Sequence, residues 1–419
     1  MFHDSILHGD EAKKTKTAFL WSRILDTPFW AIFNMLPFIL YRDLHATPFQ
    51  LAVILALKPV SSIFSMYWSS LIDQKRERLL PNIIWGGFLR HLPFLFFPFI
   101  DNCWIFIAIF GFHMMLSRGA QPAWIEILRI NIPEVSREKT FAFGAALGHV
   151  GDAIFPFVLG SLLDGYFLAW KWIFPVTAAL SLLSILLQRK IPIRLNSILK
   201  SDSNKIKPLK ELIAQPWIAA WKLIKNRPDF ARFQIAFMIS GVGLMIMQPA
   251  LTIFYVDELN LSYTQLAVAL TAFKGIGFAL TSPLWAKWFN KMNIYRFTCL
   301  VTVLLCIFPY FVILSQYNIA WLYLGYLGYG IMQAGSSLCW NMSGPIFAKE
   351  EDSSLYTSVN VVTVGLRGCI APALGSALCA YADSTMVLVL GSLICLVAVE
   401  RLLTYSNFAP GEMLQKIKL

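Results

Sequence analysis

Apolar residues recur along the chain in blocks of about 20, and short polar segments separate these blocks. A helix of about 20 apolar residues crosses the roughly 30 Å hydrocarbon core of a bilayer, so the pattern predicts membrane-spanning helices. Alternation with a period of two, which indicates a transmembrane barrel, is absent from the sequence. The predicted spans cover residues 17–41, 50–72, 81–100, 103–123, 141–163, 168–187, 231–254, 264–286, 295–315, 319–341, 355–381 and 385–404.

We therefore expect an all-α membrane protein with twelve transmembrane helices in two six-helix bundles. Residues 1–187 form the predicted N-terminal bundle, and residues 231–419 form the C-terminal bundle with a short tail. Between them, residues 188–230 form a basic cytoplasmic linker. In this linker Trp217 and Trp221 fall at helical spacing with lysines on the other face. This pattern is typical either of an amphipathic helix on the anionic cytoplasmic leaflet or of a solvated tether.

Composition and charge agree with this architecture. Of the 419 residues, 57% are hydrophobic and 14% are charged, whereas an ordinary soluble domain has about 25% charged residues. Basic residues such as Lys13, Arg137 and Lys291 gather on one side of the predicted spans, and the other side has little beyond Arg42 and Lys171. By the positive-inside rule, both termini lie in the cytoplasm and the protein is a multi-pass inner-membrane protein. The net charge of +11 then marks the cytoplasmic face, so no nucleic-acid partner is expected.

The sequence contains no pattern that indicates a cofactor or a metal. Its seven cysteines form no Cys-x-x-Cys pair and no cluster with histidine. A phosphate-binding glycine loop is also absent, so transport driven directly by ATP hydrolysis is not supported. The polar start, residues 1–16, has no cleavable signal pattern, so the first span is expected to be retained.

Three motifs recur in the same order in the two halves, which predicts an internal repeat. The pairs are Gly119 and Trp124 with Gly335 and Trp340, Pro156 and Gly160 with Pro372 and Gly375, and Lys58 and Asp73 with Lys274 and Asn290.

Several of these segments resemble the major facilitator superfamily. The segment Ser69-Ser-Leu-Ile-Asp73-Gln-Lys-Arg76-Glu-Arg78 is similar to the family's loop Gly-x-x-x-Asp-Arg-x-Gly-Arg-Arg, and its repeat runs from Ala286 to Asn290 and Lys291. Arg118 before Gly119 and the run from Ala169 to Phe174 resemble two further family motifs. The resemblance implies a secondary transporter, not an enzyme, that works by alternating access. It also implies that the two loops act as conformational latches; the latch positions are Ser69, Asp73, Arg76, Arg78, Ala286, Asn290 and Lys291.

Charged residues inside the predicted spans are the candidates for solute binding or coupling. A charge at membrane depth costs about 2.5–3.5 kcal/mol or more, so it usually has a function or a specific partner. The candidates are Asp26, Lys58, Arg118, His149, Asp152, Lys274 and Arg367. His149 and Asp152 share one helix face and could form a proton-coupling pair, or a polar pair packed between helices. Asp26 has Arg23 one turn earlier as a candidate partner.

The resemblance implies that Lys58 and Arg367 meet across the halves, and that Lys274 faces Asp152. Two cations without an obvious acid indicate an anionic ligand, since buried charge needs compensation. With Arg118 added, we expect a small organic or phosphorylated anion as the solute, with protons as a coupling partner or exchange of two anions. The alternative for Lys58, Lys274 and Arg90, a further charged residue inside a predicted span, is that they snorkel or pair locally. Alternatives for the whole protein are a sensor that binds solute without flux, an exporter and, less well supported, a membrane enzyme. A monomer is expected.

Overall fold

The computed structural model describes residues 2–74, 78–192, 209–289, 291–348 and 353–408. Some side chains within these ranges, including those of Ser69, Asp73, His149 and Asp152, lie outside the described set. The described part of the chain is helical and contains no strand.

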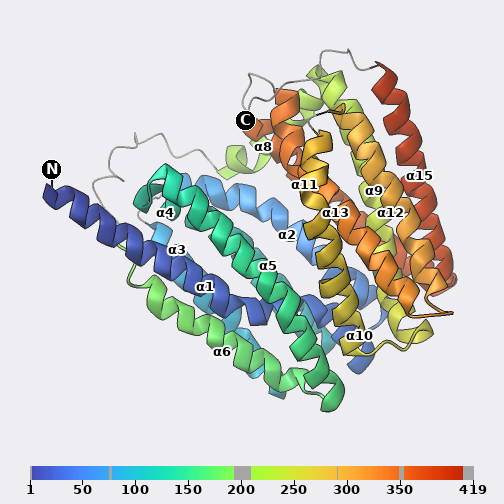
Figure 1. Cartoon of the computed structure of the whole chain (residues 1–419), viewed down its shortest axis with the longest axis horizontal. Coiled ribbons are helices and arrows are strands. Elements are labelled where there is room, and N and C mark those ends of the chain that lie inside the picture. Colours follow the sequence, from blue (N-terminus) through green and yellow to red (C-terminus); the bar gives the residue numbers. More distant parts are fainter. Residues whose placement is uncertain (1, 75–77, 193–208, 290, 349–352, 409–419) are drawn as a thin grey trace. The chain divides into compact units, whose positions relative to one another are not determined.

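The helices of the described part follow one another along the chain (Figure 1). Up to residue 192 they are α1 (Phe2–Asp43), α2 (Pro48–Gln74), α3 (Leu79–His91), the 3-10 helix η2 (Leu92–Phe99), α4 (Cys103–Asn131), α5 (Glu134–Gly165) and α6 (Trp170–Gln188). The later helices are α8 (Leu209–Asn226), α9 (Pro228–Ile253), the π-helix η3 (Phe254–Glu258), α10 (Tyr263–Ala267), the π-helix η4 (Val268–Phe273), α11 (Lys274–Phe289), α12 (Ile294–Leu314), α13 (Ala320–Ala348), α14 (Ser353–Tyr381) and α15 (Ser384–Phe408).

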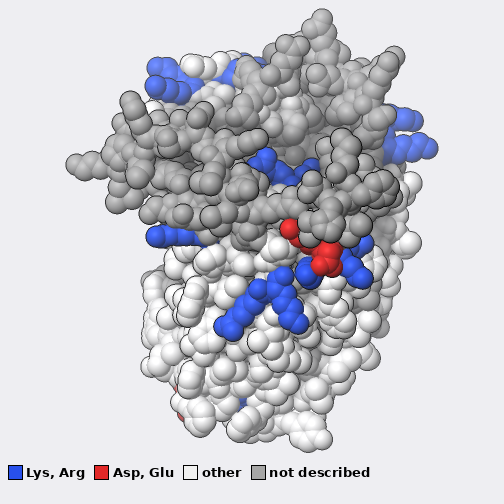
Figure 2. All heavy atoms as spheres, turned by 90° about the vertical axis from the view of Figure 1, so that its left-hand side faces the viewer, with Lys and Arg blue, Asp and Glu red and all other residues white. Residues whose placement is uncertain are grey.

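Eight stretches of helix in the described part are long and apolar enough to cross a membrane, and Pro48–Phe64 and Ile154–Gly165 are shorter apolar helices. Large apolar side chains such as Trp85 and Leu280 are exposed, as expected for helix faces that contact lipid. Figure 2 shows a face on which most of the described surface is uncharged and most charged side chains lie toward one end. These observations establish a multi-pass membrane protein. Twelve spans and cytoplasmic termini stay a prediction.

The predicted span 81–100 differs from the structure in its conformation. The α-helix ends at His91, and η2 continues from Leu92 to Phe99 as a 3-10 helix. Pro93 and Pro98 lie in this segment, and proline lacks the backbone N–H that an α-helix needs. The tighter winding therefore has a local cause in the sequence.

The chain divides into two compact units. One comprises Met1–Leu44 and Ser61–Leu212, and the other comprises His45–Val60 and Ile213–Leu419, so α2 contributes to both. In the first unit, α1 packs against α5 and α6, and α3 packs against α4 and α6. In the second unit, α9 packs against α14 and α15, and α12 packs against α13 and α15. The order of contacts is the same in the two units, as expected for an internal repeat.

The repeated glycines have a common packing role. A Cβ atom at Gly119 would lie 2.7 Å from Cδ2 of Trp68, and a Cβ atom at Gly335 would lie 3.1 Å from Cδ2 of Trp285. Each glycine thus lets an indole ring from another helix lie against its backbone. The recurring Trp124 packs edge-on against Phe19 with 5.5 Å between ring centroids.

The predicted linker contains helix α8, whose buried side is formed by Ala220 and Leu223. These residues belong to the core cluster that also contains Phe230 and Tyr356. Trp221 on the same helix is 71% exposed. Helix α8 therefore has one face packed on the second unit and one large aromatic ring left uncovered.

Candidate functional site

The candidate Asp26 is held by a cluster of polar groups inside the first unit. Its Oδ2 lies 2.9 Å from Nη2 of Arg90 and accepts a hydrogen bond from Nε1 of Trp30 at 3.0 Å. Its Oδ1 lies 3.0 Å from Nε2 of His91. Arg90 and His91 both belong to α3, so one carboxylate on α1 ties the two helices together.

The partner of Asp26 differs from the one that the sequence suggested. The expected neighbour Arg23 lies with its guanidinium over the ring of Phe19, 5.3 Å from the centroid. The groups within ion-pair distance of Asp26 are Arg90 and His91 instead. A residue one turn earlier on a helix is close in sequence, but here the packing of α1 on another helix decides which cation reaches the carboxylate.

A second histidine completes the cluster from α4. His113 is fully buried, and its Nδ1 lies 3.0 Å from the carbonyl oxygen of Arg90. The His91 and His113 rings are 5.2 Å apart between centroids. The rings of Phe29, Phe33 and other aromatic residues surround His113, so the cluster is polar at its centre and aromatic at its edge.

The second unit buries a guanidinium group. Arg367 on α14 is 9% exposed, and its Nη1 donates a hydrogen bond of 2.9 Å to the carbonyl oxygen of Phe237 on α9. The guanidinium carbon lies 5.0 Å from the centroid of the Phe237 ring. Its Nε is buried without a hydrogen-bond partner, and no carboxylate among the described residues is paired with it.

The position of Arg367 depends on a glycine. A Cβ atom at Gly241 would lie 1.8 Å from Nη1 of Arg367 and 2.0 Å from its guanidinium carbon. Any side chain at position 241 must therefore displace the guanidinium. The local reason that α9 accepts this cation is the missing side chain at Gly241.

A buried polar network lies beside Arg367 along the same two helices. Gln234 on α9 donates a hydrogen bond to Asn360 on α14, and Asn360 donates one of 2.9 Å to Ser343 on α13. The hydroxyl of Thr363, one turn before Arg367, lies 3.4 Å from Oε1 of Gln234. The contact between α9 and α14 thus carries a continuous line of polar groups within a largely apolar unit.

For the remaining candidates the structure shows burial and a few neighbours, or describes no side chain. Arg118 is half-buried, and its Nε is a buried atom without a hydrogen-bond partner among the described residues. Lys58 and Lys274 are half-buried, and Lys58 precedes Pro59, which lies against Gly368 one residue after Arg367. The side chains of His149 and Asp152 lie outside the described residues, so their pairing stays a prediction.

The structure does not describe the side chains of most of the predicted latch positions. Arg76 and Asn290 lie outside the described residues, and Ser69 and Asp73 lie in helix α2 with side chains that are not described. Arg78, Ala286 and Lys291 are exposed near helix ends. The latch function stays a prediction.

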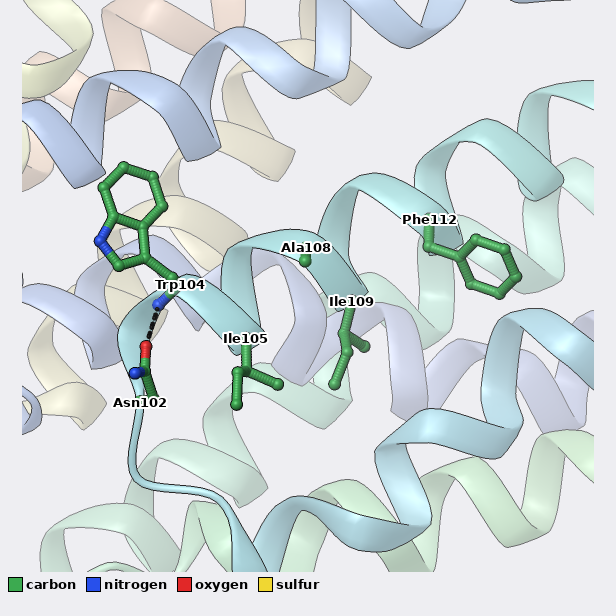
Figure 3. A pocket seen from close by; sticks show the side chains of 6 residues that line it. All are labelled: Asn102, Trp104, Ile105, Ala108, Ile109 and Phe112. Atoms are coloured by element: carbon green, nitrogen blue, oxygen red, sulfur yellow. Dashed lines mark hydrogen bonds between the residues drawn. The ribbon is translucent and has the colours of Figure 1, made fainter.

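A surface hollow on α4 has a composition that does not suit a polar solute. Its lining consists of Asn102, Trp104, Ile105, Ala108, Ile109 and Phe112, all at the start of one helix (Figure 3). The only polar side chain in this lining, Asn102, caps the helix by accepting a hydrogen bond of 2.8 Å from the backbone N–H of Trp104. The hollow is therefore an apolar helix face suited to lipid.

Sequence reasoning missed the cluster that Arg90, His91 and His113 form around Asp26. All three stand in long apolar segments, which is the one signal that marks them in the sequence. These residues meet because α1, α3 and α4 pack together, and no motif in the sequence predicts this contact.

Comparisons with known proteins agree on the fold. A profile of the Major Facilitator Superfamily matches residues 24–372 and 235–408. The nucleoside transporter NupG, in a mutant form, has a similar structure with a TM-score of 0.75 and 14% identity, covering 93% of this chain and 99% of that one. A POT family transporter in complex with 5-aminolevulinic acid has a TM-score of 0.70 and 14% identity, covering 95% of this chain and 96% of that one.

A search of curated protein sequences finds no match to this chain. The family profile nevertheless spans most of the chain, and the two similar solved structures named above are transporters. The chain therefore belongs to the Major Facilitator Superfamily, and it is a membrane transporter rather than an enzyme.

Proposed function

We propose that this protein is a secondary transporter that moves a small organic or phosphorylated anion across the inner membrane by alternating access. The observation that carries the proposal is Arg367, a buried guanidinium whose Nε has no hydrogen-bond partner and which has no paired carboxylate in the described part of the chain. A buried charge without compensation is costly, and a planar guanidinium suits a carboxylate or phosphate group. An anionic solute supplies the missing partner.

Arg118, Lys58 and Lys274 add further positive charge to the membrane-spanning helices, and we assign them supporting roles in solute binding. In this proposal Arg367 makes the direct contact with the anion. The polar groups of Gln234 and Thr363 beside it would accept or donate hydrogen bonds to the uncharged part of the solute.

For coupling, we propose Asp26 and the pair His149 and Asp152 as the protonation sites, with exchange of two anions as the alternative. We propose that the two latch loops, around Asp73 and Asn290, control the opening of the cytoplasmic side. The boundaries 1–187, 188–230 and 231–419, the twelve spans, the cytoplasmic termini and the monomeric state are part of the same proposal.

A flux experiment separates transport from sensing. The purified protein is placed in liposomes, and uptake of labelled organic and phosphorylated anions is measured against neutral and cationic metabolites. We expect net flux of at least one anion, lost in Arg367→Ala and retained in Arg401→Ala, whose side chain is exposed beside Glu400. Binding of an anion without flux would support a sensor, and flux of neutral or cationic solutes unaffected by Arg367→Ala would contradict the anion-binding role. Flux that is outward in cells would indicate an exporter.

Thermal unfolding in detergent gives an independent test of the solute class. A ligand at about 100 times its dissociation constant stabilises the native state by about 2.7 kcal/mol. We expect anions to raise the melting temperature of the wild type and of Arg401→Ala, but not of Arg367→Ala. If only neutral compounds raise the melting temperature, Arg367 has a structural role and does not bind the solute.

A further inference from the structure

Both ring nitrogens of His91 face hydrogen-bond acceptors. Nδ1 lies 2.8 Å from the backbone carbonyl oxygen of Gly87. A carbonyl oxygen only accepts, so Nδ1 must carry a hydrogen. The Nε of Arg90 lies 3.5 Å from the same nitrogen, which is too long to compete with the carbonyl contact. The carbonyl oxygen of Gly87, which belongs to the same helix α3, therefore places the first proton of the His91 ring on Nδ1.

The other ring nitrogen faces the carboxylate. Nε2 lies 3.0 Å from Oδ1 of Asp26, within ion-pair distance, and both atoms are buried without a hydrogen-bond partner among the described residues. With the only proton on Nδ1, Nε2 would present a lone pair to a carboxylate oxygen. Two acceptors at 3.0 Å, shielded from water, repel each other, and electrostatic repulsion is strong where the dielectric constant is low. A proton between them converts this repulsion into a charge-assisted hydrogen bond.

We propose that Asp26 and His91 form a proton-binding site, in which one exchangeable proton is held between Oδ1 of Asp26 and Nε2 of His91 at neutral pH. The inference deepens the proposed function, on which it rests for Asp26 as a protonation site, by naming His91 as the group that shares the proton; it does not depend on the identity of the solute. Binding of the proton adds one positive charge to the pair, whether it resides on the ring or on the carboxyl group. Its loss removes the link between α1 and α3 at this point and leaves the link through Arg90.

The charged and titratable groups around the site come from three helices. Asp26 and Arg23 come from α1, Arg90 comes from α3, and His113 comes from α4. Helix α6 and the segment η2 contribute aromatic rings, with Phe94 stacked against Phe174. Arg90 contacts Oδ2 and leaves Oδ1 for the shared proton.

His113 lies beside this site, and one of its two ring nitrogens can accept a proton. Its Nδ1 faces the carbonyl oxygen of Arg90 and therefore carries a hydrogen, so the buried Nε2 holds a lone pair without a donor in the described structure. The two rings, at 5.2 Å between centroids, form a short row of imidazoles that starts at Asp26. Histidine is the side chain whose charge most readily changes near neutral pH, so this row suits a proton rather than a metal or an organic ligand.

Nitrogen-15 NMR of the whole protein, labelled only in its six histidines, tests the proposal directly. The His91 signals are assigned by their loss in His91→Gln, and infrared difference spectra between pH 6 and pH 9 report on the carboxyl group. At pH 7 we expect either two protonated nitrogens on His91 or a protonated Asp26 that donates to Nε2. A neutral His91 with an unbound Nε2, together with an ionised Asp26, would overturn the proposal.

A variant pair identifies the carboxylate that holds the proton. In Asp26→Asn we expect His91 to show a single protonated nitrogen at pH 7, because an amide can donate to Nε2 and does not stabilise a positive ring. Asp164→Asn in the same unit, 4.0 Å from Arg42, is the control and should leave the His91 signals unchanged. If the wild-type proton resides on the ring, unchanged His91 signals in Asp26→Asn would contradict the assignment; if it resides on the carboxyl group, the infrared band of that group must disappear in Asp26→Asn, and its persistence would contradict the assignment. If Asp26→Asn does not fold, the wild-type spectrum decides. None of these measurements requires a solute, so they stand even if the anion proposal fails.

Discussion

The indole ring of Trp68 lies against the backbone of Gly119, where a Cβ atom would be only 2.7 Å from Cδ2. The same relationship recurs between Trp285 and Gly335 in the second unit, where a Cβ atom would also lie 2.6 Å from Cγ2 of Val301. The contacts recur at matching sequence positions: at Gly119 the ring of Trp68 occupies the space of a side chain, and at Gly335 the methyl group of Val301 does so together with the ring of Trp285.

We expect Gly119→Ala and Gly335→Ala to destabilise the protein, because overpacking of a close contact costs about 1–3 kcal/mol. The measurement is the midpoint of thermal unfolding in detergent. Gly148→Ala is the matched control for the first unit, because no heavy atom of the described side chains and backbone lies within 4 Å of its Cβ position. If Gly119→Ala unfolds at the same temperature as Gly148→Ala, the indole contact does not determine the choice of glycine.

Gly241→Ala should weaken solute binding without removing any charge. The new Cβ would lie 1.8 Å from Nη1 of Arg367, so the guanidinium must move from its place against α9. We expect the dissociation constant of a bound anion to rise about tenfold or more, since hydrogen bonds to charged groups contribute about 1.5–3 kcal/mol. Gly328→Ala, with open space at its Cβ position, is the control. Equal affinity in the two variants would show that Arg367 does not contact the anion.

Asp26→Asn should destabilise the protein strongly, by about 3–5 kcal/mol, because it leaves the guanidinium of Arg90 buried without its acid. Arg90→Gln should have a similar effect, and the double variant should cost clearly less than the sum of the two. The unfolding midpoints of all three variants form a double-mutant cycle. Asp101→Asn is the control for an ion pair at the surface, where its partner is Lys171 and the expected cost is about 0–1 kcal/mol. Additive effects of Asp26→Asn and Arg90→Gln would argue against the pairing.

The buried network around Asn360 predicts a second non-additive pair. Asn360→Leu leaves the amide of Gln234 without its partner, and an unsatisfied buried polar group costs about 1–3 kcal/mol. The double variant Gln234→Leu with Asn360→Leu removes both polar groups and should recover part of the lost stability. Thermal unfolding of the single and double variants measures this recovery. If the double variant is less stable than either single variant, Gln234 and Asn360 stabilise the protein by more than the hydrogen bond that they make with each other.

Trp221 on α8 gives a test of contact with the membrane surface. Its ring is 71% exposed, so Trp221→Ser should change the unfolding midpoint little. If the ring rests in the interface of an anionic membrane, brominated lipids should quench part of the tryptophan fluorescence, and that part should disappear in Trp221→Ser. Trp217 stays in place in both proteins. Equal quenching in the two proteins would favour a solvated position of the exposed ring.

The apolar blocks of this chain predicted a helical membrane protein, since a run of about 20 apolar residues is typical of a membrane-spanning helix. The repeat was also visible, because Gly119 and Gly335 stand at matching distances from Trp124 and Trp340. The side chains that occupy the space beside the two glycines, however, are Trp68 at Gly119 and Val301 with Trp285 at Gly335, which the spacing did not indicate.

The candidate site was predicted only in part. Asp26 and Arg367 were identified because charge is rare and costly inside an apolar span. The partners of Asp26 could not be found in the same way, since Arg90 stands 64 residues away and His113 is farther still.

The sequence by itself determined that the chain is helical, membrane-spanning and internally repeated, because these properties depend on residues close together along one helix. Only the tertiary structure decided that Asp26 pairs with Arg90 and His91 and that Arg367 lies against Gly241. The physical reason is that hydrophobicity sets which segments enter the bilayer. Which faces of those segments meet is set by the fit of small residues, rings and buried polar groups between helices.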